Sequence, residues 1–190
     1  LPVKTLPQLI ALAKARPGQL NYGSAGNGNA THLAGELFRA MANVNVVHVP
    51  YKGSGPALVD LMGGQMQFMF SNLTAALPHI KSGKLRALAV TGARRTPIAP
   101  ELPTVAEAGY PDYEASNWHG IAVPAKTPKE IVARLSGELL RILKLPDIRE
   151  RLTAAGTEPA GNLPEEYAAA IKADLIKWAQ VVKAAGIKAE

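Results

Sequence analysis

The sequence predicts an α/β fold with a largely parallel sheet. Apolar, β-branched runs of strand length alternate with segments of helical periodicity along most of the chain. Glycine and proline separate these segments, for example at residues 16–18 and 63–64. A glycine-rich turn, residues 21–32, lies between a predicted strand and a predicted helix, which is the order found in a βα unit.

In the first ninety residues, predicted helices and strands follow one another in turn. Thr5 suits the N-cap of the first helix, and Pro7 suits its first turn. The β-branched run at residues 44–49 predicts a buried strand. Pro56 suits the first position of another helix, which Gly63 ends. The predicted helices span residues 4–15, 33–41, 57–62 and 74–81, and the predicted strands span residues 18–20, 44–49, 65–70 and 85–91.

The second half predicts mostly helix. Thr104 should cap a helical turn, and Thr127 should cap a strong helix that begins at Pro128. This strong helix carries an apolar stripe formed by Ile131, Leu135, Leu139 and Ile142. The predicted helical segments span residues 105–109, 128–144, 146–152 and 164–185, and one further strand spans residues 116–123.

Composition narrows the classes of function. The chain has 190 residues and no cysteine, which excludes thiolate metal sites, disulfides and a cysteine nucleophile. No apolar run is long enough to span a bilayer, so direct membrane insertion is not expected. The first hundred residues hold ten bases and two acids, which favours an anionic partner. Nucleic acid is not expected, because the bases are scattered and aromatic residues are few.

The glycine-rich turn is the main candidate site. Backbone N–H groups and the dipole of the following helix together favour an anion there. A phosphate-binding P-loop would need a lysine after Gly28, where the chain has Asn29. A dinucleotide fingerprint would need glycine or alanine at Thr31. Two alternatives for this turn nevertheless remain. The turn could belong to a phosphate- or nucleotide-binding enzyme domain, or its glycines could serve only the backbone conformation of the turn.

Other candidate chemistry is sparse. The four histidines, His32, His48, His79 and His119, have no metal-binding spacing, so neither a metal nor a cofactor is expected. Ser24 lies in a glycine-rich turn but lacks the nucleophile-elbow pattern, and no nucleophile–base pair is evident. The pattern indicates a binding protein with no catalytic residues, not an enzyme.

Asn72 is a second candidate, because it follows a predicted strand and precedes a helical turn. In open parallel sheets, ligands bind beyond the carboxyl ends of the strands. Asn72 could therefore face the same crevice as the glycine-rich turn. The alternative is that this asparagine only caps its own turn.

Several motifs, in order along the chain, resemble one known family. The glycine-rich stretch SAGNGNATHLAGELF at residues 24–38 is similar to the signature of the Bug-type periplasmic substrate-binding proteins of tripartite tricarboxylate transporters. Further matches to this family lie at residues 47–57, 76–91, 102–109 and 178–187. The likeness therefore runs through almost the whole chain.

The resemblance implies a two-lobed Venus-flytrap protein of the periplasmic-binding-protein type. Such a protein would capture a small carboxylate (a di- or tricarboxylate, an amino acid or an aromatic acid) in the periplasm and deliver it to membrane transporter subunits. Residues 3–116 would form the complete second lobe, and residues 117–190 would be the returning part of the first lobe. The signal peptide and the N-terminal third of the family pattern are not found in this chain, which we therefore expect to be a truncated fragment.

The resemblance and the turn together give the predicted ligand-binding residues. We expect backbone N–H groups of residues 26–29 to receive the carboxylate, with further hydrogen bonds from side chains. Asn29 stands where the family usually has serine or threonine, and Ser71 stands where it often has aspartate. The predicted ligand-binding residues are Ser24, Ala25, Gly26, Asn27, Gly28, Asn29, Thr31, His32 and Asn72.

Overall fold

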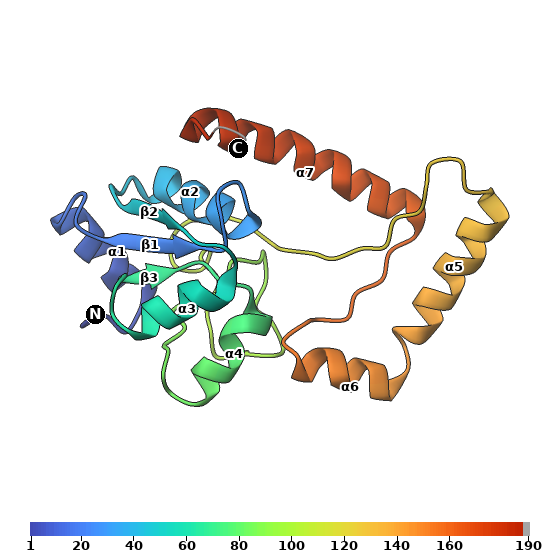
Figure 1. Cartoon of the computed structure of the whole chain (residues 1–190), viewed down its shortest axis with the longest axis horizontal. Coiled ribbons are helices and arrows are strands. Elements are labelled where there is room, and N and C mark those ends of the chain that lie inside the picture. The colour runs from blue at the N-terminus through green and yellow to red at the C-terminus, as the bar shows by residue number, and fades with distance from the viewer. Residues whose placement is uncertain (188–190) are drawn as a thin grey trace.

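A computed structural model describes residues 1–187 of the chain. Seven helices and three strands in these residues form an α/β unit followed by an extended helical segment (Figure 1). The helices are α1 (Leu6–Ala15), α2 (Ala30–Ala42), α3 (Ser54–Met62), α4 (Leu73–Lys81), α5 (Lys129–Ile142), α6 (Pro146–Ala154) and α7 (Pro164–Ala185). The strands are β1 (Asn21–Ser24), β2 (Val47–Pro50) and β3 (Phe68–Met69).

The sheet is parallel, with the strand order β2-β1-β3. The chain leaves β1 on one side to reach β2 and then crosses β1 to reach β3. Because all three strands run in the same direction, their carboxyl ends meet at one edge. Helices α2, α3 and α4 begin at or just beyond this edge, and it holds the candidate site.

The core forms between the sheet, α1 and α2. Tyr22, Phe38 and Phe68 are buried in it, and their rings contact one another or the neighbouring Phe70. Gly35 is required where α2 crosses Tyr22, because a Cβ at this position would lie 2.3 Å from a ring carbon of the tyrosine. The close approach of helix and strand orients α2 on the sheet.

The first helix agrees with its prediction. The Thr5 side chain accepts a hydrogen bond from the Gln8 N–H and so caps α1. The apolar face of this helix is buried, and it consists of Leu6, Leu9, Ile10 and Ala13. Local capping and periodicity are sufficient to define this element.

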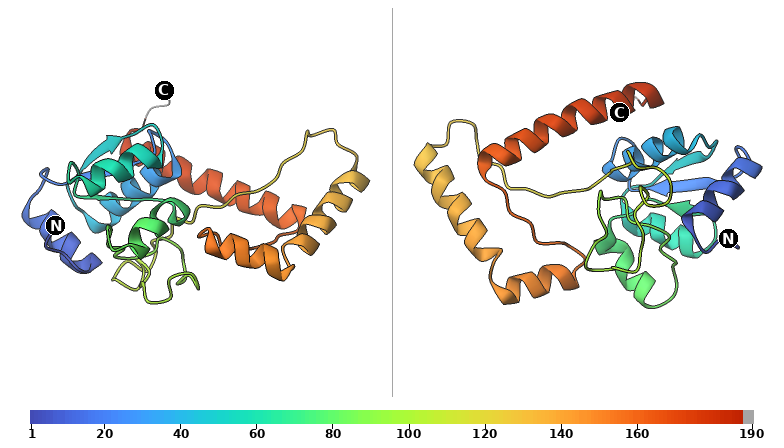
Figure 2. Two further views of the ribbon diagram at one scale, coloured as in Figure 1. Left: turned by 60° about the horizontal axis from the view of Figure 1, so that its bottom comes forward. Right: turned by 180° about the vertical axis from the view of Figure 1, so that it is seen from behind.

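The C-terminal segment extends away from the α/β unit and then returns to it. Helices α5 and α6 stand apart from the sheet, whereas α7 packs along α2 (Figures 1 and 2). The segment that leaves the α/β unit, residues 114–118, is called the outgoing chain. Trp118 in this segment donates its Nε1–H to Asp174 of α7, and Glu114 pairs with Lys177 of α7. Ile131 and Leu135 on α5 are exposed, whereas Leu139 and Ile142 are partly buried, so the described residues cover only part of the predicted apolar stripe.

Several predicted elements are wrong. Residues 116–123 form no strand, and residues 85–91 contribute only an isolated bridge between Val90 and Thr104. β2 begins at Val47 and lies at an edge of the sheet, so Val47 is 44% exposed rather than buried. Helix α5 has Pro128 at its N-cap position with no side-chain cap, so Thr127 does not cap it. No helix in residues 1–187 is both long enough and apolar enough to cross a membrane.

Candidate functional site

The predicted turn connects β1 to α2 at the carboxyl edge of the sheet. Gly26 and Gly28 adopt φ angles of 148° and 68°, in the region that favours glycine. Hydrogen bonds across the turn hold it closed: Ala25 N–H donates to Thr31 Oγ1 at 2.8 Å, and Asn29 N–H donates to the Gly26 carbonyl at 3.2 Å. The chain therefore reaches the start of α2 through a compact, internally bonded loop.

Two predicted ligand-binding side chains take part in these bonds. Asn29 is the N-cap of α2, and its Oδ1 accepts from Thr31 N–H at 3.1 Å and from the Thr31 hydroxyl at 3.2 Å. Thr31 in turn accepts from Ala25, as described above. Asn29 is exposed and Thr31 is buried, so these residues fix the helix start from its outer and inner sides.

The loop amides are also largely engaged within the chain. Gly26 N–H donates to Ser24 Oγ at 3.2 Å, and Gly28 N–H donates to His32 Nδ1 at 3.0 Å. Asn27 is exposed and lies beside a small pocket that His32 and Arg39 also line. In the part of the chain that the structure describes, no acceptor lies against the N–H of Ala30, at the first position of α2. Ala30 therefore joins the candidate anion donors.

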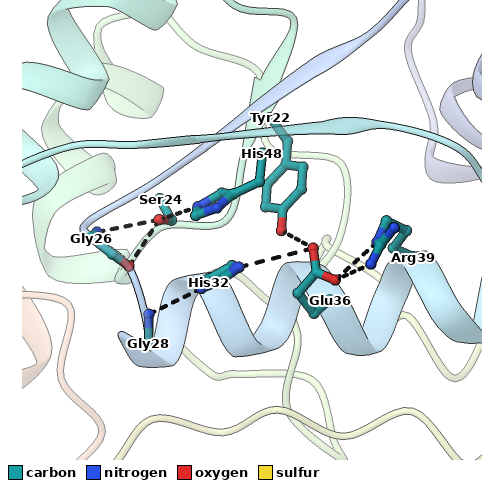
Figure 3. A network of polar contacts seen from close by, with 8 residues as sticks. All are labelled: Tyr22, Ser24, Gly26, Gly28, His32, Glu36, Arg39 and His48. Atoms are coloured by element: carbon teal, nitrogen blue, oxygen red, sulfur yellow. Dashed lines mark hydrogen bonds and ion pairs between the residues drawn. The ribbon is translucent and has the colours of Figure 1, made fainter. Parts of the chain in front are cut away.

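A polar cluster lies behind the loop, buried except for the partly exposed Arg39 and His48 (Figure 3). The imidazoles of His32 and His48 stack with ring centroids 3.7 Å apart. Glu36, on the next turn of α2 after His32, accepts from the Tyr22 hydroxyl at 2.6 Å and from Arg39 Nε at 2.9 Å. The cluster consists of Tyr22, Ser24, His32, Glu36, Arg39 and His48.

Burial controls the protonation of this cluster. Burial, followed by the neighbouring His32, lowers the pKa of His48 to about 4. Burial also lowers the pKa of His32, although Glu36 opposes this shift. Both imidazoles are therefore neutral at pH 7. Burial and the Glu36 carboxylate raise the pKa of Tyr22, which stays a hydrogen-bond donor.

The cluster contains a serine–histidine contact that sequence reasoning missed. Ser24 Oγ lies 2.7 Å from His48 Nε2, so the expectation that the chain has no such pair is wrong. Ser24 is 0% exposed, however, and its hydroxyl donates to the Gly26 carbonyl at 3.1 Å. A buried hydroxyl with this partner has no approach path for a substrate, so the pair supports the loop and is not a nucleophile.

Asn72 lies at the N-cap position of α4, three residues after the end of β3 at Met69. Its side chain makes no cap hydrogen bond, so the local-capping alternative is not observed. Instead, Asn72 Oδ1 accepts from Asn117 Nδ2 at 2.9 Å. Because β1 and β3 are adjacent and parallel, the start of α4 lies beside the start of α2.

Both helix starts border one large hollow. It has a volume of about 1790 Å³ and lies between the α/β unit and helices α5 and α6. Ala30 and Thr31 line it from α2, and Asn72 and Thr74 line it from α4, while Asn117 lines it from the outgoing chain. Asn27 and His32 line a separate pocket of about 390 Å³. The structure thus joins Thr31 and Asn72 at one hollow and leaves His32 behind the loop.

Sequence reasoning missed six residues of this region: Tyr22, Ala30, Glu36, Arg39, His48 and Asn117. The Glu36 position carried a signal, because it is four residues after His32 and is one of only two acids in the first hundred residues. His48 and Asn117 carried none, since their partners are distant in sequence. No group of three or more histidine, aspartate or glutamate residues in residues 1–187 could hold a metal ion.

Comparison with known proteins decides the family. The family described as "Tripartite tricarboxylate transporter family receptor" matches residues 1–187. The chain belongs to this receptor family. The predicted Bug-type relationship, the periplasmic-binding-protein fold and the prediction that the chain is not an enzyme are thereby confirmed.

Comparison with individual proteins shows the same relationship. The Protein BugT of Bordetella pertussis is 37% identical over 188 residues, which are 99% of this chain and 58% of BugT. The R. palustris protein Rpa4515 with adipate superposes with a TM-score of 0.90 at 40% identity, over 98% of this chain and 62% of that chain. MatC from Rhodopseudomonas palustris, with bound malate, gives a TM-score of 0.80 at 31% identity, over 95% and 63% of the two chains. This receptor chain thus spans about three-fifths of the length of these relatives.

Proposed function

We propose that the chain is the ligand-binding part of an extracytoplasmic receptor that captures a small carboxylate. Membership of the receptor family supports transport, and family receptors are periplasmic. Two solved relatives contain adipate and malate, both of which are dicarboxylates. The proposed destination of the ligand is the membrane subunits of a tripartite tricarboxylate transporter.

One geometric observation carries the carboxylate proposal. The N-termini of α2 and α4 start at neighbouring parallel strands and border the same hollow. Helix N-termini carry partial positive charge and unpaired N–H groups, which together favour a carboxylate. Charge-assisted hydrogen bonds contribute about 1.5–3 kcal/mol each. Three or four of them, less the cost of association, correspond to roughly micromolar affinity.

The surrounding charge agrees with an acidic ligand. The first hundred residues carry a net charge of +8, and the strand end beside Asn72 carries the neutral Ser71. A ligand with two or three carboxylates therefore meets little repulsion at this edge. We retain di- and tricarboxylates as the first candidates, followed by amino acids and aromatic acids.

The division into lobes is part of the same proposal. Residues 3–116 would form one lobe, which contains the sheet and both helix starts. Residues 117–190 would belong to a second lobe, completed by further chain in the full-length receptor. Exposed apolar side chains on α5, such as Ile131 and Leu135, support a covering segment there. The hollow would then lie between the two lobes, as the resemblance to Venus-flytrap proteins implies.

The test is a thermal-shift screen on the full-length protein. Adipate, malate, citrate, glutamate and benzoate are compared with a neutral sugar and with ATP. We expect stabilisation by at least one carboxylate and none by the sugar or ATP. Stabilisation by the sugar alone contradicts the carboxylate proposal, and stabilisation by ATP alone favours the nucleotide-binding alternative.

A further inference from the structure

Two imidazoles behind the glycine-rich loop, the buried His32 and the half-buried His48, contact the loop by hydrogen bonds to Gly28 and Ser24. We propose that His32 and His48 are positioning residues, which select the backbone donors that the loop offers to a ligand without touching it. The inference rests on the proposed carboxylate function for the identity of the ligand. It reassigns His32, which the sequence analysis had placed among the ligand contacts.

His32 has no free edge toward the large hollow, although it lines the separate pocket of about 390 Å³ behind the loop. It is 4% exposed, and its Nδ1 accepts the Gly28 N–H at 3.0 Å. Accepting at Nδ1 requires the proton on Nε2, which lies 3.9 Å from Glu36 Oε1. One face of the ring stacks on His48. Within residues 24–32, Ala30 and Thr31 line the hollow and His32 does not.

His48 acts on the other end of the loop. We assign the Ser24 hydroxyl proton to the Gly26 carbonyl at 3.1 Å, an assignment in which His48 donates its Nε2–H to Ser24 Oγ at 2.7 Å. Ser24 Oγ also accepts the Gly26 N–H at 3.2 Å. His48 therefore fixes the serine that holds Gly26, just as His32 holds Gly28 directly.

Together the two imidazoles remove two amides from the set of ligand donors. With Gly26 and Gly28 engaged inside the loop, the donor that β1, the loop and α2 leave facing the hollow is at the start of α2, where Ala30 N–H has no acceptor among the described residues. The helix dipole acts at this point. The imidazole pair thus directs a carboxylate to the start of α2, at Ala30, instead of to the amides of Gly26 and Gly28.

The two histidines use different ring nitrogens, which gives a crossed test. Asparagine places its oxygen near the imidazole Nδ1, and glutamine places its amide near Nε2. His32→Asn should therefore keep the bond to Gly28 and His32→Gln should lose it. At the other position the order reverses, because His48→Gln should keep the bond to Ser24 and His48→Asn should lose it.

Two readouts are measured on the full-length protein: adipate and malate affinity by calorimetry, and amide exchange of Gly26 and Gly28 by NMR. We expect His32→Gln and His48→Asn to bind about tenfold more weakly than the paired substitution at the same position, as loss of one buried hydrogen bond implies. Exchange should rise at Gly28 in His32→Gln and at Gly26 in His48→Asn. His79→Gln, on α4, is the control and should match the parent in both carboxylate affinity and amide exchange.

Other outcomes overturn the inference. Equal losses from both substitutions at one position mean that the ring, not its hydrogen bond, matters. Weaker binding with unchanged exchange means that the histidine contacts the ligand. If a variant fails to fold, Ser24→Ala should raise exchange at Gly26 and leave Gly28 unchanged, and no rise contradicts the positioning role. If the parent binds no carboxylate, the proposed function fails, while the exchange pattern still tests the two histidines.

Discussion

The imidazole rings of His32 and His48 stack almost parallel, with centroids 3.7 Å apart and an angle of 5° between their planes. His32 comes from α2 and His48 from β2, so the contact joins the helix behind the loop to the neighbouring strand. Such a stack disfavours protonation of both rings, because two imidazolium ions at this separation would repel each other strongly, and burial lowers the pKa of each ring. The contact therefore makes the loop sensitive to acid.

The first prediction concerns acid stability. Burial lowers the pKa of His48 to about 4, whereas an unfolded histidine titrates near pH 6.5. Between these values the unfolded chain binds a proton that the folded chain does not bind. The free energy of unfolding should therefore fall as pH falls through this window, by up to about 1.4 kcal/mol per pH unit for this group. Urea unfolding at several pH values measures the slope.

The groups facing the pair define the control. Glu36, Arg39 and Tyr22 surround the imidazoles, and Glu36 favours a charged His32 while Arg39 opposes it. His48→Gln removes the titrating group but keeps a donor for Ser24, so its slope should be shallower. His119→Gln, at an exposed histidine, should leave the slope unchanged. A parent slope that persists in His48→Gln would assign the effect to other groups.

The second prediction concerns the packing of α2 on β1. A Cβ at Gly35 would lie 2.3 Å from the Tyr22 ring, which is fully buried and cannot swing out. Gly35→Ala should lower the free energy of unfolding by about 1–3 kcal/mol through overpacking. Gly137→Ala on exposed α5 meets no atom within 4 Å and should raise it by about 0.5–1 kcal/mol. Equal effects of Gly35→Ala and Gly137→Ala on the free energy of unfolding would show that Tyr22 moves freely.

Local features of the fold could be predicted from the sequence. The Thr5 cap and the buried face of α1 depend on residues within one or two turns, and the prediction of α7 over residues 164–185 agrees with Pro164–Ala185. The predictions of strands at residues 85–91 and 116–123 were wrong, because a strand also needs a neighbouring strand with which to pair. Val90 finds only Thr104, and residues 116–123 find none among the described residues.

The candidate site was predictable in outline but not in its contacts. The turn, its glycines and Asn72 were visible as patterns, because each is local. The Ser24–His48 contact depends on sheet register, in which Tyr22 pairs with His48 and Ser24 with Pro50. Nothing near Ser24 in the sequence encodes that register, so the buried pair could only be found in three dimensions.

The third prediction separates two roles of Gly28. Its φ of 68° favours glycine, and a Cβ would meet no protein atom within 4 Å. Gly28→Asn should fold normally, since asparagine tolerates this backbone conformation, whereas Gly28→Val should lose about 1–2 kcal/mol. Because Gly28 does not line the hollow and its N–H is held by His32, Gly28→Asn should bind carboxylate like the parent. A tenfold loss of affinity in Gly28→Asn, about 1.4 kcal/mol, would mean that the ligand approaches Gly28 closely.

The last prediction concerns the hydrogen bond between Asn117 and Asn72. Asn117 Nδ2 donates to Asn72 Oδ1 at 2.9 Å. Because the oxygen of the Asn72 carboxamide faces Asn117, its NH₂ group points away from Asn117. Both residues line the hollow, so Asn117 orients a candidate ligand donor at the start of α4. Asn117→Ala frees that carboxamide to rotate and should weaken carboxylate binding about two- to tenfold, as expected for one net hydrogen bond. Asn162→Ala, at another exposed asparagine lining the hollow, is the matched control and should bind like the parent. If Asn72→Ala weakens binding and Asn117→Ala does not, Asn72 binds the ligand without help from Asn117.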